Sequence, residues 1–310
     1  MIATLTPNPA VDQTVCLPRL EVGSINRFQT FHLDPAGKGI NVSRMAHRLG
    51  WPTMAFGFLA GDIGRFAEHA LDDEGVPHHF VRVPGQTRLN VTVLDRASGT
   101  ATSLFGPGPP IEEARLAQLE EVMSFWLQTG RILVVAGRLP PNVRPNFYAS
   151  YVRLAASMGV RTILDAEGEP LHLGMLARPF LIKPNVAEAE GLLGRALPDL
   201  KAVCQAVIEL RQRGIEVVVI SMGADGAVCG CGERVWRAVP PKVDRRSTVG
   251  SGDSLVAGLA VAIARGDEVL EGLRLGTAAG AATAAALGTA MGSAEEVAAL
   301  LPRVQIEEVT

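Results

Sequence analysis

The chain has 310 residues, which is enough for one large domain or two small ones with a substantial buried core. Hydrophobic residues make up 47% of it and charged residues 20%, as in ordinary globular proteins. A net charge of −3 and an aromatic content of 5% argue against nucleic acid or an acidic membrane as a partner. The amino-terminal residues lack the basic and apolar segments of a signal peptide, so we expect a cytoplasmic protein.

Two segments, residues 11–34 and 86–106, contain alternating or polar strand-like runs, and neither is followed by a crossover helix of its own. Strands of this kind can leave one face to solvent or to a partner. The sequence shows no internal repeat and no low-complexity linker. We therefore expect one α/β domain over residues 1–310, with these two segments forming a small, discontinuous β lid over the site.

A first glycine-rich turn, residues 37–41, opens a helix with an apolar face. Lys38 and Asn41 at such a helix start could contact a sugar hydroxyl or a phosphate. A surface lysine in a flexible turn is the alternative explanation. The turn is not a Walker phosphate loop, because Gly39 stands where Ser or Thr would follow the lysine.

Strands and helices alternate through the middle of the chain. The apolar runs predict strands at residues 132–136, 162–165, 180–182 and 217–221, and amphipathic patterns predict helices at about 143–158, 185–195 and 199–213. Near-continuous apolar strands indicate a mostly parallel sheet with helices on both faces. Sites in such sheets lie at the carboxyl ends of the strands, which brings Asp165, residues 183–185 and residues 221–223 to one edge.

A second glycine-rich turn, residues 247–254, runs directly into an apolar helix. The first N–H groups of a helix are unpaired and attract anions. Asp253 in that turn would repel a bound phosphate, but it could take a proton from a hydroxyl that attacks a phosphoryl group, while Gly250, Ser251 and Gly252 form an anion hole. The alternative is an ordinary helix cap, because Asp and Ser are favoured there.

Residues 275–291 are apolar but rich in Ala and Gly, which predicts a tightly packed buried helix and not a membrane span. The four cysteines lack metal-ligand spacing and are expected to be free thiols. A dinucleotide-binding G-x-G-x-x-G fingerprint is missing from the sequence, which disfavours an oxidoreductase.

Four motifs, at residues 37–41, 183–188, 221–226 and 248–253, occur in the order and at the spacing of the ribokinase-like (phosphofructokinase-B) sugar kinases. The whole chain resembles this family, and within it the branch that phosphorylates hexose phosphates. The resemblance implies a three-layer ribokinase-like fold, with a sheet of about eight strands between helices and a small β lid. It also implies homodimers that form through the lid.

The resemblance implies two groups of ligands. On the sugar side they are Asp12, Gly37, Lys38, Gly39, Asn41, Arg88, Asn90, Arg138 and, from a neighbouring subunit, Arg27; on the nucleotide side they are Lys183, Asn185, Ser221, Gly223, Gly226 and Thr248. Lys38 and Arg88 are the candidates for the phosphate that the sugar already carries. Asn185 and Glu188 would hold Mg²⁺ partly through water, although the same spacing also forms a helix-capping pair.

The resemblance implies ATP-dependent phosphorylation of a ketohexose phosphate, with fructose 1-phosphate converted to fructose 1,6-bisphosphate as the favoured reaction. Tagatose 6-phosphate and fructose 6-phosphate are alternative acceptors, and a sugar-phosphate binding or regulatory protein without turnover is the alternative from another class. Three departures from close relatives leave the sugar open. Arg138 replaces a serine and either adds a phosphate ligand or blocks part of the pocket, and the Asp165-Ala166-Glu167 segment lacks the usual hydroxyls. Ser251 resembles the tagatose-type members, whereas the fructose-type members usually carry Ala there.

Overall fold

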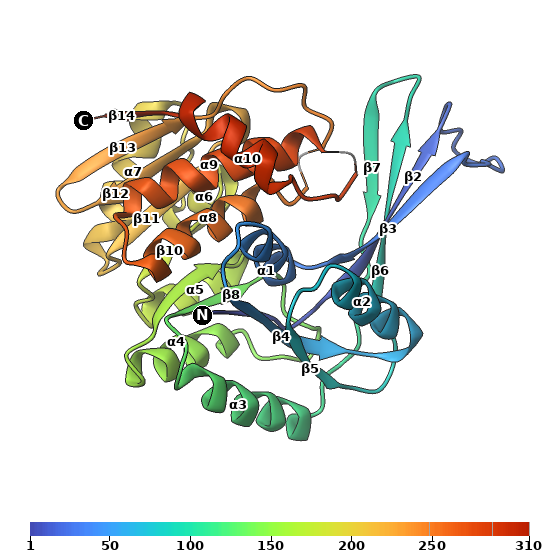
Figure 1. The fold of residues 1–310 in the computed structure, drawn as a ribbon, viewed down its shortest axis with the longest axis horizontal. Coiled ribbons are helices and arrows are strands. Elements are labelled where there is room, and N and C mark those ends of the chain that lie inside the picture. Colours follow the sequence, from blue (N-terminus) through green and yellow to red (C-terminus); the bar gives the residue numbers. More distant parts are fainter. Residues whose placement is uncertain (248, 287, 310) are drawn as a thin grey trace.

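The structure is a computed structural model that describes residues 1–247, 249–286 and 288–309. In this part of the chain a central sheet has ten strands, shown with the surrounding helices in Figure 1. Across the sheet the strands are β14 (Gln305–Glu308), β13 (Arg234–Val239), β12 (Ala227–Cys231), β11 (Val217–Ser221), β10 (Leu181–Ile182), β9 (Arg161–Asp165), β8 (Ile132–Ala136), β1 (Ile2–Thr6), β4 (Thr53–Leu59) and β5 (His78–Arg82). Strands β11 to β5 in that order are parallel, and β12, β13 and β14 extend the sheet antiparallel.

Helices cover both faces of this sheet, so the expected three-layer α/β fold is confirmed. One face carries α1 (Lys38–Arg48), α2 (Gly61–Asp73), α8 (Ser251–Arg265), α9 (Val269–Ala285) and α10 (Ala294–Leu300). The other face carries α3 (Glu113–Leu127), α4 (Phe147–Ser157), α5 (Gly168–Leu176), α6 (Val186–Leu193) and α7 (Leu200–Gln212). Strand β8 shows why its sequence is continuously apolar. Leu133 and Val135 enter one core, whereas Ile132 and Val134 enter the other.

Helices α8 and α9 pack with their backbones almost in contact. A Cβ atom added to Gly258 would lie 2.2 Å from the backbone nitrogen of Gly276, and one added to Gly276 would lie 2.3 Å from the carbonyl oxygen of Leu255. Only glycine fits such an approach. The Gly-rich and Ala-rich composition of this region is therefore a requirement of helix packing.

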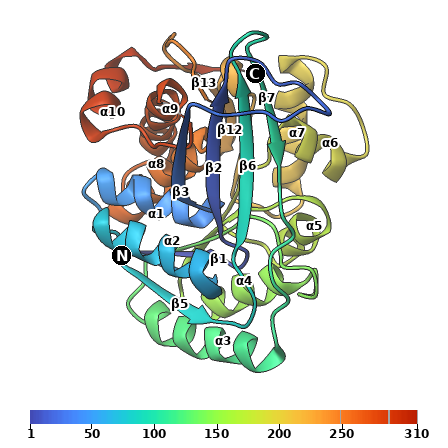
Figure 2. The same cartoon turned by 90° about the vertical axis from the view of Figure 1, so that its right-hand side faces the viewer.

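A second sheet stands beside the main body and has the order β3 (Thr30–Ala36), β2 (Ala10–Leu17), β6 (Arg88–Asp95) and β7 (Thr100–Leu104). Figure 2 views this small sheet face on, in front of the helices. Its strands largely coincide with the segments that the sequence singles out. One face carries Asp12 and Asn90, whereas neighbouring strand positions such as Phe31 and Leu104 leave large apolar side chains exposed.

The expected number of strands and the expected bounds of two helices were wrong. The main sheet has ten strands in the described residues instead of about eight, because the short hairpin strands at its antiparallel edge gave no clear periodic signal. Helix α4 begins at Phe147 and not at residue 143, since Pro145 disfavours a helical conformation in the residue before it. Helix α9 ends at Ala285, well before residue 291. Within the described residues, every helix is too short or too polar to span a membrane.

Candidate active site

The candidate site lies at the carboxyl ends of the parallel strands, where the sequence predicts it. Asp165 ends β9, Lys183 directly follows β10, and Ser221 ends β11. Asn185 and Ser221 also form a parallel β-bridge beyond the strand ends. The helices α1, α6 and α8 begin at this same edge. Side chains of the described residues accept from first-turn N–H groups of α1 and α6, whereas none caps α8.

The second glycine-rich turn presents an open helix start. Gly250 is the N-cap residue of α8, and its φ of 78° favours glycine. No side chain of the described residues caps this helix. Asp253 does not cap the helix either. Its carboxylate oxygen Oδ2 accepts a hydrogen bond of 2.7 Å from Nδ2 of Asn41, in the first turn of α1. The capping alternative for this motif therefore does not describe its geometry, and the N–H groups after Gly250 remain available to an anion.

Asp253 has the electrostatic environment of a base. It is only 7% exposed, and burial is the largest influence on its pKa, followed by the negative charge of Asp165. Lys38, the Asn41 hydrogen bond and Lys183 oppose these effects, and the balance raises the pKa of Asp253 to about 6. A carboxylate with this pKa is mostly ionised at neutral pH and accepts a proton more readily than an ordinary aspartate.

Asp165 joins two lysines beneath the site. Its Oδ1 atom lies 2.8 Å from Nζ of Lys38, and its Oδ2 atom lies 3.3 Å from Nζ of Lys183. Burial alone would raise the pKa of Asp165, but the charges of Lys183 and then Lys38 hold it below the ordinary value. A Cβ atom added to Gly252 would lie 3.6 Å from Nζ of Lys183, so this ammonium group borders the catalytic turn.

The small sheet contributes a polar pair to the site. Nδ2 of Asn90 donates a 2.8 Å hydrogen bond to Oδ1 of Asp12, and burial raises the pKa of Asp12. Gly37 precedes α1 with a φ of 133°, and a Cβ atom added there would lie 2.7 Å from the methyl group of Thr6. Gly39 is buried against the same strand. This close packing fixes the start of α1, and with it Lys38 and Asn41.

The three arginines of the prediction differ in their surroundings. Arg88 is half-buried and donates to backbone carbonyl oxygens, including that of Asn8 at 3.0 Å. Arg138 is exposed and forms an ion pair with Glu167. Arg27 is exposed in the connection between β2 and β3, and it forms no hydrogen bond or ion pair with the other predicted site residues among the described residues.

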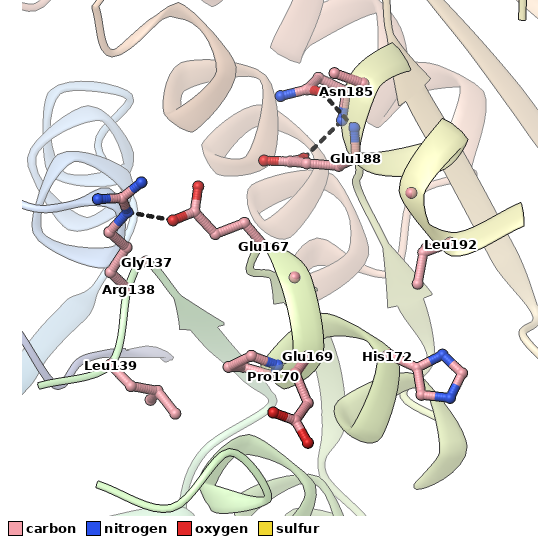
Figure 3. Close-up of a pocket in the computed structure, with 13 residues that line it drawn as sticks. Gly137, Arg138, Leu139, Glu167, Glu169, Pro170, His172, Asn185, Glu188 and Leu192 are labelled. Carbon is pink, nitrogen blue, oxygen red and sulfur yellow. Dashed lines mark hydrogen bonds and ion pairs between the residues drawn. The ribbon is translucent and has the colours of Figure 1, made fainter. Parts of the chain in front are cut away.

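Two pockets lie at this edge of the sheet, and the smaller one adjoins the second glycine-rich turn. The larger, of about 980 Å³, is lined by residues 137–139, the start of α5 and the start of α6, and Figure 3 shows its side chains. The other, of about 520 Å³, is lined by Ser221, Gly223, Gly226, Ser251, Gly252 and residues of α9. The hydroxyl oxygens of Ser251 and Thr277 are buried there without a hydrogen-bond partner among the described residues. Thr248, predicted on the nucleotide side, lies outside the described residues.

Asn185 and Glu188 form the capping box that their spacing allows. Oδ1 of Asn185 accepts a 2.9 Å bond from the Glu188 N–H, and Oε2 of Glu188 accepts a 2.8 Å bond from the Asn185 N–H. The other carboxylate oxygen, Oε1, lies 3.7 Å from Nζ of Lys38. In the described residues no three His, Cys, Asp or Glu side chains gather as metal ligands. A magnesium ion therefore fits at Glu188 only if phosphates and water supply most of its ligands.

Sequence reasoning missed the importance of Asp165 as a ligand of both lysines, although it placed this residue at the correct edge. The signal was a carboxylate directly after the apolar run of β9, since a charge at the end of a buried strand needs a partner. It also treated Glu167 only as the loss of a hydroxyl, whereas this carboxylate binds Arg138.

A buried carboxylate with a raised pKa beside an open helix start, with two lysines nearby, is the arrangement of an enzyme that transfers a phosphoryl group to a hydroxyl. The sequence pattern of the pfkB family carbohydrate kinases matches residues 6–296, and the chain belongs to this family of kinases.

Similar proteins agree over the full length of the chain. The 1-phosphofructokinase of Vibrio cholerae is 35% identical, with 98% of this chain and 96% of that protein covered. The 1-phosphofructokinase of Bacillus subtilis is 36% identical, with 99% of each covered. Among solved structures, phosphofructokinase-2 of Escherichia coli with substrates and products has a TM-score of 0.93 and 32% identity, covering 97% of this chain and 98% of that chain.

Proposed function

We propose that this kinase transfers the γ-phosphoryl group of ATP to fructose 1-phosphate and releases fructose 1,6-bisphosphate and ADP. The single observation that carries the proposal is the position of Asp253, a buried carboxylate with a raised pKa in the first turn of a helix that no side chain of the described residues caps. The full-length similarity to curated 1-phosphofructokinases supports the choice of acceptor.

Each part of the site has a role in this reaction. Asp253 takes the proton from the attacking sugar hydroxyl, and Asn41 orients its carboxylate. The N–H groups of the turn at Gly250, Ser251 and Gly252, with the adjacent Lys183, stabilise the charge that develops on the transferred group. Sugar hydroxyls bind the Asp12–Asn90 pair and the start of α1 at Gly37, Gly39 and Asn41, while the existing phosphate binds Lys38, Arg88 and Arg138.

The nucleotide occupies the pocket of about 520 Å³ between β11 and α9. Ser221, Gly223 and Gly226 leave room for the nucleotide against the backbone, and the unpartnered hydroxyls of Ser251 and Thr277 offer it hydrogen bonds. Mg²⁺, held at Glu188 through water and beside Asn185, would neutralise charge on the phosphates when bound. The cytoplasm is the proposed compartment, because ATP is available there and the four cysteines are free thiols.

The small sheet acts in this proposal as a lid and as a dimer interface. Its outer side exposes large apolar residues, including Phe31, Leu33, Leu89, Leu104 and Phe105. A second copy of the sheet would cover this surface and could bring Arg27 to the neighbouring site. A solved Escherichia coli relative, 31% identical, is described as a tetrameric inhibited form, which shows that a protein of this fold can assemble.

The reaction is tested by measuring sugar-dependent ADP release from Mg-ATP. The acceptors are fructose 1-phosphate, tagatose 6-phosphate, fructose 6-phosphate and ribose, with a reaction lacking sugar as the blank. We expect turnover with fructose 1-phosphate that the Asp253→Asn variant loses. A higher kcat/KM for another phosphorylated ketohexose would change the proposed acceptor. ADP release from none of them would favour a binding or regulatory protein.

A further inference from the structure

Arg138 and Glu167 form an ion pair at the mouth of the larger pocket. Arg138 follows the carboxyl end of β8, and Glu167 is the residue that precedes α5, so the pair links two neighbouring strand ends. Figure 3 shows their side chains directed toward one another, whereas Glu169 points away. The side chains are 60% and 41% exposed, so both partners remain accessible to a ligand that enters the pocket.

The backbone that carries Arg138 is held in place, although its side chain is not. The hydroxyl of Tyr148 donates a 2.9 Å hydrogen bond to the carbonyl oxygen of Gly137, the residue just before Arg138. Tyr148 itself is fully buried in the core. The guanidinium group therefore extends from a fixed point, and its free end is restrained mainly by the carboxylate of Glu167.

A second arginine, Arg88, lies within electrostatic range of Arg138 and forms no direct ion pair among the described residues. Arg88 donates only to backbone carbonyl oxygens among the described residues. Burial lowers the pKa of Arg88, and the charge of Asp12 raises it. The charge of Arg138 lowers this pKa, and that of Glu167 raises it. Glu167 therefore offsets part of the repulsion between the two arginines, together with Asp12.

We propose that Glu167 is an internal substitute for the substrate phosphate, which occupies Arg138 until a phosphorylated sugar displaces it and binds Arg138 in its place. This inference rests on the proposed function for the identity of the sugar, but not for the binding of phosphate. Glu167 then limits which ligands bind, because a ligand must interact with Arg138 more favourably than the carboxylate of Glu167 does.

The energies of the two contacts favour this exchange. An exposed ion pair contributes little to stability, because solvent screens it and both side chains lose freedom. A phosphate carries up to two charges and three acceptor oxygens, and the planar guanidinium group binds it through two hydrogen bonds. An unphosphorylated sugar has no group that could replace the carboxylate, so the pair would discriminate against such acceptors.

The test measures affinity with and without the pair. Isothermal titration with inorganic phosphate and with fructose 1-phosphate, in the absence of ATP, is carried out on wild type, Glu167→Gln, Arg138→Ala and the double variant. We expect Glu167→Gln to bind both ligands about 2- to 5-fold more tightly, as the loss of an exposed competing pair predicts. Arg138→Ala should weaken binding of fructose 1-phosphate about 10- to 100-fold.

Two results make the assignment specific. The double variant should bind nearly as weakly as Arg138→Ala alone, because Glu167 acts mainly through its ion pair with Arg138. Glu169→Gln, which removes a neighbouring exposed carboxylate of the same pocket, should bind like wild type. In steady-state assays the Glu167→Gln effect should fall on the KM for the sugar phosphate and not on kcat.

Unchanged or weaker phosphate binding by Glu167→Gln would overturn the proposal, and so would wild-type binding by Arg138→Ala. Equal tightening by Glu169→Gln would also overturn it, because it would mean that overall charge governs binding. Titration with inorganic phosphate needs no turnover and no particular sugar. It therefore decides the role of Glu167 even if the chain phosphorylates none of the acceptors tested for the proposed function.

Discussion

The floor of the site and its rim are built differently. On the floor, Asp253 and Asp165 are buried, and each is held by a hydrogen bond or ion pair from a side chain of another element. At the rim, Arg138 and Glu167 are largely exposed and bind mainly one another. In the proposed function, the chemistry would therefore depend on groups that cannot move independently, whereas the choice of acceptor would depend on groups that can.

Asp253→Asn is expected to have the largest effect on turnover, because it changes the buried carboxylate of the floor. An amide cannot accept the proton of the attacking hydroxyl, so kcat should fall about 10²- to 10⁴-fold. The Asn41 side chain can still donate to the new amide oxygen, so folding and nucleotide binding should persist. Turnover measured beside nucleotide titration and thermal unfolding checks this. Substantial retained turnover would exclude Asp253 as the base.

Asp165→Asn tests whether the floor is also structural. The substitution leaves the buried ammonium group of Lys183 without its carboxylate, and breaking a buried ion pair costs about 3–5 kcal/mol. Lys38 is 32% exposed, so solvent compensates its loss and the expected decrease in the free energy of unfolding is about 3 kcal/mol.

Urea unfolding of Asp165→Asn and Glu167→Gln compares the floor with the rim directly. The rim variant should change the free energy of unfolding by less than about 1 kcal/mol, because its ion pair is exposed. Equal losses in the two variants would remove the distinction between the two regions.

Gly276→Ala tests the close packing of α8 and α9. The added methyl group would lie 2.3 Å from the carbonyl oxygen of Leu255, so α8 and α9 must separate. Overpacking of this kind costs about 1–3 kcal/mol of stability. Because α8 begins at the catalytic turn, the KM for ATP should rise as well. The control is Gly191→Ala in α6, where an added Cβ atom meets no atom within 4 Å.

The pH profile of activity separates the floor from the rim. Asp253 works as a base in its ionised form, and burial raises its pKa to about 6. The value of kcat/KM should therefore fall about tenfold for each pH unit below 6 and stay level above it. The Glu167→Gln variant should show the same decrease in kcat/KM below pH 6. If the decrease shifts to another pH in this variant, the titrating group is not Asp253.

Stability should change with pH in the opposite direction. The pKa of Asp253 is higher in the folded chain than its ordinary value of 3.8, so its protonated form stabilises the fold. That contribution is complete below pH 3.8 and is lost as the pH rises through about 6. Asp253→Asn should therefore lack this part of the pH dependence of unfolding.

The sequence predicts the floor better than the rim, for a physical reason. Asp253 and Asn41 lie in glycine-rich helix starts, and those local patterns are visible without tertiary contacts. Strands such as β8 and β11 were predicted at their observed bounds because both of their faces are buried. The pairing of Arg138 with Glu167 joins side chains 29 residues apart across two strand ends, which no periodicity reveals.

Local spacing alone also does not decide the role of the Asn185–Glu188 motif. Its spacing of three residues is equally suited to a capping box and to a magnesium ligand. Only the coordinates reveal that one carboxylate oxygen is used by the cap and the other faces Lys38. A local pattern can therefore specify a helix start and leave its second role undetermined.

The backbone contact between α8 and α9 has a consequence for amide hydrogen exchange. Gly258 and Gly276 cannot separate by rotating a side chain, so the amides of these two helices should exchange only when the whole core opens. Helix α9 lines the pocket proposed for the nucleotide, and α8 starts at the turn that carries the proposed base, so both parts of the proposed site belong to one slowly exchanging unit. The small sheet, with its exposed edge strand β7, should exchange by local opening. In the proposed reaction, the motions that admit and release the sugar would therefore be left to that sheet.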